Sequence, residues 1–569
     1  MIDIRDIIQT ELEKISLKSK DGVLERPKNL KNGDFSFFVK DTLVDFGNLS
    51  VEKINHEYVE KVEVVGKFIN FHLSKKYFAD SLREIVGNPK DFGKNNSLAG
   101  QNIIIEYTDP NPFKQFHIGH LMSNAIGESV SRIIEWSGAT VTRTNYQGDV
   151  GPHVAKAIWG MKKLRVAPKS TPSLILKKLT RFFGSSSGHD DDVLKLGESY
   201  VLGSNSYEEN PEIKKEIDLI NKKVYEKTDP EINALYVWGR RISLEHFEEI
   251  YKKLGTKFSL YFFESETAPL GLFIVDELLK KGILEKSDGA IVFRGEEYGL
   301  HTRVFVNSQG LPTYETKELG LSKMKFDRQD FDQSIVVTAN EQSDYFAVML
   351  KVLEFADHRA ANRTRHVSHG MMRFADGKMS SRKGNIITGE SLICDVEKLV
   401  QEKIKDRKLS NEEKNSVAEK VAIGAIKYSI LKQSPGKDIV FDFAKSLSFE
   451  GDSGPYLQYT CARIHSLLRK AAEAGIKEGL DNPETPGELE QLLVRLPETV
   501  ERAKNEFAPQ LIATYLINVA SAFNHYYADH VIVDKNASES AYRIGLTRSV
   551  KNVLENGLYL LGITAPESM

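Results

Sequence analysis

The sequence predicts an α/β fold in which an insertion splits a parallel sheet, with a small α+β domain before it and an all-helical region after it. Three observations support this prediction. A strand, a helix and a second strand follow one another between Asn102 and Asn145, which is the pattern of a parallel βαβ unit. A polar stretch at about 164–230 interrupts the pattern before further strands appear. Beyond about Val400 the apolar residues recur at helical spacing.

Residues 1–98 are expected to form the small α+β domain. Strand-like segments lie at 35–40 and 67–73. A turn-rich stretch between Asn88 and Asn102 separates this domain from the rest of the chain. The chain opens with a helical pattern of apolar residues, which are Ile4, Ile7, Ile8 and Leu12.

Residues 99–399 are expected to form the domain that contains the parallel sheet. The segment 102–107 has the pattern of a short buried strand, and 140–145 alternates like a second strand. Between them an apolar helical stripe runs from Leu121 to Ile134. Ligands of open α/β sheets bind beyond the carboxyl ends of the strands, so a site is expected in the loop before this helix.

The insertion at about 164–230 is polar and includes a charged, helix-like stretch. Strand-like segments return after it, near Ala290 and Ser334. Residues 400–569 are expected to form a bundle of helices, because apolar spacing of the helical kind continues through most of them.

The composition excludes several classes of protein. Of the 569 residues 41% are hydrophobic, and 77 basic residues stand against 80 acidic ones, so the chain is neither disordered nor generally attracted to nucleic acid. Cys394 and Cys461 lack the spacing of a disulfide framework or a zinc site, so no metal site is expected. Because no leader pattern and no apolar run of about 18 residues occur, we expect a cytoplasmic protein without a membrane segment.

The loop before the expected helix ends in His117-Ile-Gly-His120. Backbone N–H groups and the positive end of the helix dipole would face a phosphate here, and Gly119 would let a nucleotide come close to the backbone. Histidines three residues apart share one helix face, where both can donate hydrogen bonds to phosphate oxygens in a transition state. The alternative on the residues alone is a pair of exposed helix histidines.

A second motif, Gly-Lys-Met-Ser-Ser-Arg-Lys-Gly-Asn, lies at 377–385. It is small, basic and rich in flexible residues, so it could close over a triphosphate. A basic run of this kind is more often a solvated loop, and it gains weight only together with the first motif.

The two motifs together resemble the HIGH and KMSKS motifs of class I aminoacyl-tRNA synthetases, in the same order and on either side of an inserted segment. The resemblance implies a Rossmann-like catalytic domain, a C-terminal anticodon-binding bundle, and ATP-dependent formation of an adenylate. Mg²⁺ would enter with the phosphates of ATP. The residues that the resemblance implies for ATP binding are His117, Gly119, His120, Lys378, Met379 and Ser380.

Within this class the chain resembles the arginyl-tRNA synthetases over essentially its whole length. Ser381 stands where KMSKS has its second lysine, and arginyl enzymes often carry a lysine before HIGH instead, as Lys114 does here. Further matching segments are Asn145–Gly151, Leu311–Gly320, Phe449–Asp452 and Pro455–Arg463. The catalytic residues implied are His117, His120, Lys114 and Lys378.

A free arginine presents a planar guanidinium with five donors, which paired carboxylate oxygens and an aromatic or hydroxyl group can hold. The resemblance implies that Glu264 and Glu318 clamp this guanidinium and that Tyr314 supports it. Glu318 stands where many relatives have aspartate, so its reach differs by one methylene. The backbone end of the substrate would be held by Glu106, Asn111 and Gln342.

The partners implied are tRNA(Arg), L-arginine and ATP, and arginyl enzymes generally need bound tRNA before they activate the amino acid. The N-terminal domain resembles a module that contacts the outer corner of tRNA, and monomers are usual in the family. Aromatic faces and a cation of the kind that stack on splayed-out bases are expected in the C-terminal bundle. These residues are Tyr456, Tyr459, Arg463 and Tyr527, with the terminal Met569 as a further candidate.

Three other functions remain open on the sequence. Another class I synthetase, of the cysteinyl or glutamyl type, would share both motifs but not the segment from Tyr314 to Glu318. A tRNA-binding scaffold without activity would not need intact His117, His120 and Lys378. A nucleotidyltransferase of the same broad fold would not need the long helical domain.

Overall fold

The computed structural model divides into two compact units. The sheet unit contains Asn96–Ser446 and Phe507–Pro509, and the terminal unit contains Met1–Asn95, Leu447–Glu506 and Gln510–Met569. The structure describes residues 2–27, 32–40, 49–166, 188–375, 388–480 and 486–569. The boundary expected near residue 400 falls within helix α12 (Gly389–Ile404), which belongs to the sheet unit.

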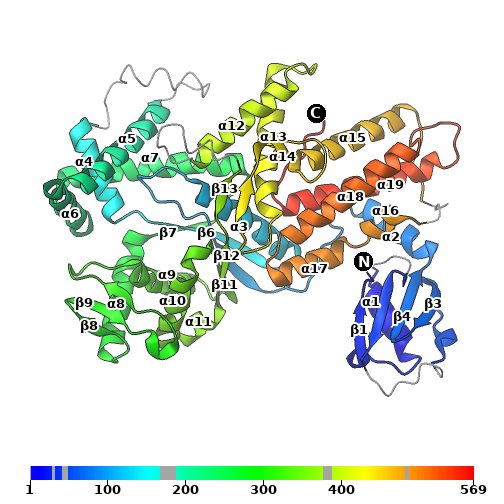
Figure 1. The fold of residues 1–569 in the computed structure, drawn as a ribbon, viewed down its shortest axis with the longest axis horizontal. Coiled ribbons are helices and arrows are strands. Elements are labelled where there is room, and N and C mark those ends of the chain that lie inside the picture. The colour runs from blue at the N-terminus through cyan, green and yellow to red at the C-terminus, as the bar shows by residue number, and fades with distance from the viewer. Residues whose placement is uncertain (1, 28–31, 41–48, 167–187, 376–387, 481–485) are drawn as a thin grey trace. The chain divides into compact units, whose positions relative to one another are not determined.

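A five-stranded parallel sheet organises the sheet unit and confirms the predicted α/β fold (Figure 1). The strand order is β12-β11-β5-β6-β7, with Asn102 of β5 opposite Thr140 of β6. The chain proceeds from β5 to β6 and β7 on one side, whereas β11 and β12 lie on the other, so the order reverses between β5 and β11. The strands are β5 (Asn102–Glu106), β6 (Thr140–Gln147), β7 (Leu260–Phe263), β11 (Gln333–Ala339) and β12 (Thr364–His369).

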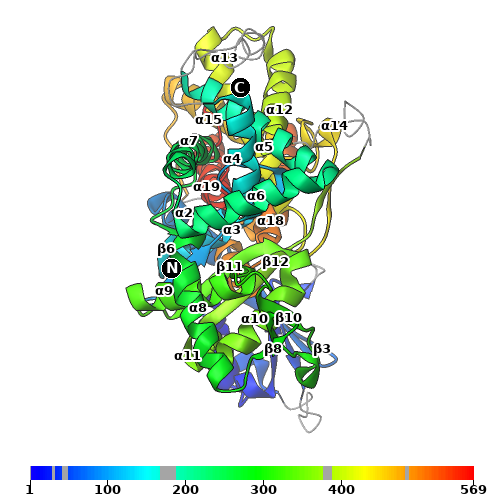
Figure 2. The ribbon, with the colours of Figure 1, turned by 90° about the vertical axis from the view of Figure 1, so that its left-hand side faces the viewer.

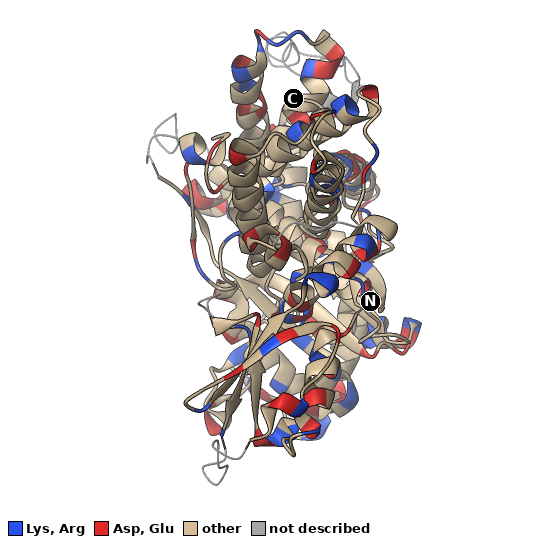
Figure 3. Cartoon of the chain, turned by 90° about the vertical axis from the view of Figure 1, so that its right-hand side faces the viewer, with Lys and Arg blue, Asp and Glu red and all other residues tan. Residues whose placement is uncertain are grey.

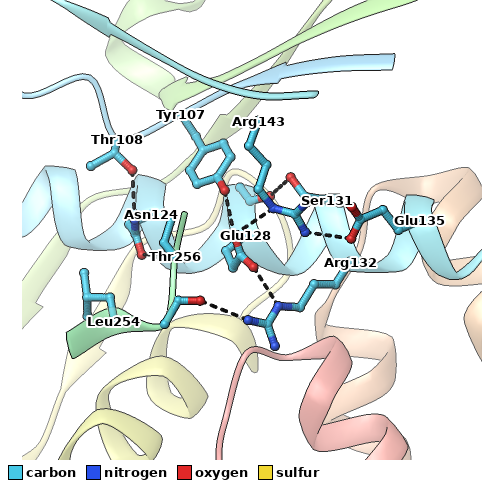
Figure 4. Close-up of polar contacts among 12 residues, drawn as sticks. Tyr107, Thr108, Asn124, Glu128, Ser131, Arg132, Glu135, Arg143, Leu254 and Thr256 are labelled. Carbon is cyan, nitrogen blue, oxygen red and sulfur yellow. Dashed lines mark hydrogen bonds and ion pairs between the residues drawn. The ribbon is translucent and has the colours of Figure 1, made fainter. Parts of the chain in front are cut away.

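Helix α3 (Ile118–Trp136) connects β5 to β6 and is fixed to them by a buried polar network (Figure 4). The carboxylate of Glu128 accepts a hydrogen bond from the Tyr107 hydroxyl at 2.6 Å. It also accepts from Arg132 at 2.7 Å and from Arg143 at 3.1 Å. Because removing one member would leave a buried charge without its partner, this network holds the second half of α3 against Tyr107, which follows β5, and against Arg143 of β6.

The described part of the polar insertion, from residue 188 onward, is helical. Its helices pack against one another around Trp159, Ile217 and Trp238 (Figure 2). Asn210 and Asp229 cap the following helices through their side chains, and a proline occupies the first turn in both cases. The helices of this group are α4 (Pro152–Leu164), α5 (Gly188–Glu209), α6 (Pro211–Glu226) and α7 (Pro230–Leu254).

Helices α8 (Glu264–Lys280) and α9 (Tyr314–Arg328) approach each other closely. A Cβ on Gly271 of α8 would lie 1.9 Å from the carbonyl oxygen of Thr316, so only glycine fits there. The other elements of this unit are β8 (Glu285–Ser287), β9 (Ala290–Phe293), β10 (Arg303–Val306), α10 (Ser343–Ala356), α11 (His358–Arg363), β13 (Met372–Phe374), α13 (Asn411–Leu431), β14 (Ile439–Phe441) and α14 (Phe443–Ser446).

The terminal unit combines an N-terminal α+β part with C-terminal helices, as the sequence predicts. Its antiparallel sheet has the order β1-β2-β4-β3. The bidentate pair between Arg26 and Glu498, at 2.8 Å, joins the two parts, and Asn552 donates to the Ile85 carbonyl at 3.0 Å. The elements are α1 (Ile4–Glu13), β1 (Gly22–Glu25), β2 (Phe35–Val39), β3 (Val59–Val65), β4 (Phe68–Leu73), α2 (Lys75–Gly87), α15 (Gly454–Glu473), α16 (Glu488–Leu493), α17 (Leu496–Glu506), α18 (Gln510–Asp529) and α19 (Ser540–Leu560).

Basic and acidic residues alternate along the helices and strands, as Figure 3 shows for one side of the chain. This distribution agrees with the net charge of -3. Among the described helices, none combines the length and the apolar character that a bilayer crossing requires.

Candidate active site

The carboxyl edge of the parallel sheet gathers most of the residues that the sequence singles out. Glu106 is the last residue of β5, and Asn111 lies in the loop that follows it. Glu264 follows β7 directly, and Gln342 ends the short turn after β11. Because neighbouring parallel strands end at one edge, residues far apart in the chain meet where the strand order reverses.

His117 and His120 form the entrance to α3. His117 is the N-cap residue, and its Nδ1 accepts the N–H of Gly119 at 3.1 Å. The Nδ1 of His120 accepts the N–H of His117 at 3.2 Å, and the two rings stack with centroids 3.5 Å apart. A backbone N–H can only donate, so each neutral ring carries its proton on Nε2 and can donate from there.

Both histidines are held in the neutral form. Although His117 is exposed as a residue, partial desolvation of its ring and the nearby charge of Lys114 lower its pKa. Burial, His117 and Lys114 lower the pKa of His120 further. The Lys114 side chain is half-buried and lies over the ring of Tyr200 on α5, with its Nζ 5.5 Å from the centroid. Lys114 therefore adds a positive charge beside two neutral hydrogen-bond donors.

Lys378, Met379 and Ser380 lie outside the described residues, as does Ser381. Where the described chain resumes, Thr388 and Gly389 contact the histidine motif. Thr388 forms an antiparallel bridge with His117, and the N–H of Gly389 donates to the carbonyl of Phe116 at 2.8 Å.

The side chains of Asn111 and Glu264 occupy the space beside the α-carbon of Gly148. A Cβ placed on Gly148 would lie 2.1 Å from Oδ1 of Asn111 and 3.4 Å from the carboxyl carbon of Glu264. Gly148 follows β6, so three strand ends contribute to this place. An amide and a carboxylate at such close range can hold the polar groups of one small cationic ligand.

Lys317 forms a buried ion pair with Glu264. Its Nζ lies 2.6 Å from Oε2 of Glu264, with side chains 6% and 4% exposed. The ammonium also lies 6.0 Å from the ring centroid of Tyr225 of α6 and 5.3 Å from that of Tyr314. Tyr314 itself is 63% exposed. Burial raises the pKa of Glu264, and the charge of Lys317 offsets only part of this effect. For Lys317, burial lowers the pKa, but the charge of Glu264 outweighs burial and the pKa is raised.

A second group of acids lies beside this pair. Glu106 pairs with Lys325 of α9 at 2.7 Å, and both side chains are buried. Burial and the neighbouring charge of Glu106 raise the pKa of Glu318 to about 8. The same two causes raise the pKa of Asp109, whose Oδ1 accepts the N–H of Tyr146 at 2.7 Å. An incoming cation would therefore favour the ionised forms of Glu318 and Asp109.

Asp149 anchors the residues around Glu264. Its two carboxylate oxygens accept from the N–H and the hydroxyl of Ser265, both at 2.8 Å. The Tyr236 hydroxyl and Arg240 of α7 donate to it at 2.9 Å. Because Ser265 follows Glu264, a buried carboxylate with four donors fixes the start of α8.

The residues expected to contact tRNA lie in the terminal unit. The Arg463 guanidinium lies 5.0 Å from the ring centroid of Tyr459 and 5.2 Å from that of Tyr527. Arg463 also donates to Asn524, whose amide donates to the Tyr456 hydroxyl at 2.9 Å. Four of the expected residues thus form one aromatic and cationic cluster. Met569 ends the chain and is half-buried.

Sequence reasoning missed five contributors to the site: Gly148, Asp149, Tyr200, Tyr225 and Lys317. Gly148, Asp149 and Lys317 stand inside segments that resemble the family, but the sequence does not show which side chains they pair with. Tyr200 and Tyr225 belong to the insertion, where the polar composition gave no sign of a pocket.

Two family models match the chain. Residues 82–443 match the catalytic domain of the class I tRNA synthetases of the arginine type, tRNA synthetases class I (R). Residues 457–569 match the DALR anticodon binding domain.

The chain is also similar to proteins named arginine–tRNA ligase. That of Clostridium perfringens is 32% identical over all of this chain and 98% of its own length, and that of Ligilactobacillus salivarius is 31% identical over 100% and 99%. Among solved structures, the arginyl-tRNA synthetase of Thermus thermophilus has a TM-score of 0.77 at 24% identity, covering 100% of this chain and 99% of its own. That of Plasmodium falciparum has a TM-score of 0.74 at 20% identity, covering 100% and 98%. These structural likenesses show a shared fold.

Proposed function

The chain belongs to the class I arginyl-tRNA synthetases, and we propose that the carboxyl edge of its sheet activates L-arginine with ATP before transfer to tRNA(Arg). It is an arginine–tRNA ligase with a class I catalytic domain and an anticodon-binding domain. The observation that carries the proposed site is the meeting of two features at one sheet edge. A pair of imidazole donors opens α3, and Asn111 and the carboxylate of Glu264 come together beside Gly148.

In the first step a carboxylate oxygen of arginine attacks the α-phosphorus of ATP. The bond from that phosphorus to the bridging oxygen breaks, and pyrophosphate leaves. The Nε2–H groups of His117 and His120 stabilise the negative charge on the phosphate oxygens, and Lys114 and Lys378 neutralise the triphosphate. Mg²⁺ enters as part of the ATP complex and adds to this charge stabilisation. Gly119, Met379 and Ser380 complete the nucleotide site.

Arginine is held at both ends. Glu264 and Glu318 accept the guanidinium donors, with Tyr314 beside the plane. Glu106, Asn111 and Gln342 hold the α-ammonium and carboxylate. The buried acids at this edge, Glu106 with Lys325 and Glu318 with a raised pKa, support a site that receives a positive ligand.

In the second step the 2′-hydroxyl of the terminal tRNA ribose attacks the carbonyl carbon of the adenylate, and AMP leaves. The cluster of Tyr456, Tyr459, Arg463 and Tyr527 binds anticodon bases by stacking, and Met569 is a further tRNA contact. We propose three domains. Residues 1–98 contact the outer corner of tRNA, residues 99–399 carry out catalysis and include the insertion at about 164–230, and residues 400–569 bind the anticodon. The enzyme is proposed to work as a monomer and in the cytoplasm. For a monomer, sedimentation equilibrium of the purified protein would give a mass of 64.1 kDa.

The proposal is tested by ATP–pyrophosphate exchange with arginine, with and without tRNA. Exchange that depends on arginine and on tRNA is expected. Exchange without any amino acid would favour a nucleotidyltransferase, and tRNA binding without exchange or charging would favour an inactive scaffold.

A further inference from the structure

Lys317 places a cation inside the pocket proposed for the arginine side chain. Its ammonium lies 2.6 Å from Glu264 and faces the rings of Tyr225 and Tyr314, at 6.0 Å and 5.3 Å from their centroids. An acid with aromatic faces around it is the environment that a guanidinium prefers. The protein therefore fills part of its own substrate site with a tethered alkylammonium group.

We propose that arginine must displace the Lys317 ammonium from Glu264, and that this competition excludes free amino acids with an alkylammonium side chain. The inference rests on the proposed role of Glu264 in binding the guanidinium. It makes Lys317 a specificity-determining residue of the site.

The chemistry of the two cations gives the direction of the selection. A free lysine brings the same ammonium group that Lys317 already supplies, and the tethered group needs no binding from solution. A free arginine instead brings a planar fork that can bond both carboxylate oxygens of Glu264 at once. A guanidinium therefore gains by the exchange, whereas a second ammonium gains nothing.

The geometry supports displacement over simultaneous binding. Glu264 is 3% exposed as a residue, and a Cβ placed on Gly148 would lie 3.4 Å from its carboxyl carbon, so little room remains around it. A bidentate guanidinium needs both carboxylate oxygens, and Lys317 holds one of them. Lys317 has a flexible four-carbon stem, so its ammonium can move away while the helix stays in place.

Isothermal titration of the full-length protein with arginine and with lysine, at pH 8.5 to favour the ionised form of Glu264, tests the proposal. Lys317→Met keeps a chain of similar length and removes the competing charge. It is expected to lower the dissociation constant of arginine by at least about threefold, because arginine no longer has to displace the Lys317 ammonium from Glu264. It is also expected to make lysine binding measurable. Lys317→Arg, which retains a tethered cation, should still exclude lysine.

Lys323→Met is the matched control, because Lys323 lies on the same helix and pairs at the surface with Asp327 at 3.0 Å. It should bind as the wild type does. Arginine binding that is unchanged or weaker in Lys317→Met, with lysine still excluded, would show that Lys317 only holds Glu264 in place and would overturn the proposal. If thermal unfolding shows that Lys317→Met is not folded, Lys317→Gln gives the same two outcomes. Failure of the wild type to bind arginine would instead contradict the proposed function.

Discussion

The imidazole rings of His117 and His120 lie with their centroids 3.5 Å apart, and each ring accepts a backbone N–H through Nδ1. Both rings are neutral, since desolvation and the charge of Lys114 lower their pKa. Two Nε2–H donors are therefore fixed at the positive end of α3 before any ligand arrives. This arrangement stabilises developing charge without a change of protonation state.

The variant His117→Asn tests this role without loss of the helix cap. Asparagine is a good N-cap residue, so its side-chain oxygen can still accept the N–H of Gly119. It lacks a donor at the place of Nε2, and the rate of pyrophosphate exchange at saturating substrates is expected to fall by about a hundredfold. The arginine dissociation constant should stay unchanged. A variant with wild-type exchange would remove His117 from the catalytic group.

Arginine binding is expected to strengthen as the pH rises from 6 toward 8. Burial and Glu106 raise the pKa of Glu318 to about 8, so below that pH the free enzyme must lose a proton when the carboxylate receives a guanidinium. The affinity should rise by up to about tenfold per pH unit in this window and level off above it. Titration calorimetry of the wild type and of Glu318→Gln measures the effect. Glu318→Gln should bind more weakly with a flatter profile, and an unchanged pH slope in this variant would assign the proton to another group.

Gly148→Ala is expected to raise the KM for arginine by about tenfold to a hundredfold, with little change in the KM for ATP. Its Cβ would meet Oδ1 of Asn111 at 2.1 Å, so the asparagine side chain must leave its place. Gly87→Ala is the matched control, since a Cβ there meets nothing within 4 Å. Equal changes in the two KM values would mean a general disturbance of the fold.

Lys114→Ala is expected to lower adenylate formation by about a hundredfold, because the cation beside the histidine pair is lost. Binding of tRNA, measured by filter retention, should remain nearly intact. Lys156→Ala serves as control, because Lys156 also stacks on a tyrosine of the insertion, with its Nζ 4.3 Å from the ring centroid of Tyr207, but lies outside the proposed site. Wild-type exchange in Lys114→Ala would mean that Lys114 does not compensate for Ser381.

Tyr527→Ala is expected to weaken tRNA(Arg) binding by about tenfold, since stacking on one base contributes about 1–3 kcal/mol. Tyr527→Phe keeps the ring and should bind as the wild type does. Equal affinity for all three proteins would show that the tyrosine only packs against Arg463. Pyrophosphate exchange measured at saturating tRNA should be the same in both variants.

The elements with regular patterns could be predicted from the sequence. The apolar stripe from Leu121 to Ile134 lies on α3, and the alternating residues after Thr140 form β6. Burial of one face imposes a characteristic spacing of apolar residues on a helix and on a strand, so both elements could be predicted. The parallel order followed, since a short βαβ unit permits few other arrangements. The domain limit at residue 400 stays a proposal, because helical periodicity does not reveal which core α12 joins.

The pairings within the site could not be predicted. Lys317 and Glu264 stand 53 residues apart in the chain, and their contact depends on how closely α8 and α9 approach at Gly271. Tyr225 reaches the pocket from an insertion whose composition indicates only a solvated helical segment. Such contacts depend on tertiary packing, which neither spacing nor charge pattern encodes.

The most direct test of the central claim is charging of unfractionated tRNA with each of the twenty amino acids in the presence of ATP. We expect that, of the twenty amino acids, only labelled arginine is attached to tRNA and that the labelled product is tRNA(Arg). Charging with a different amino acid would contradict the arginine pocket around Glu264, Glu318 and Tyr314.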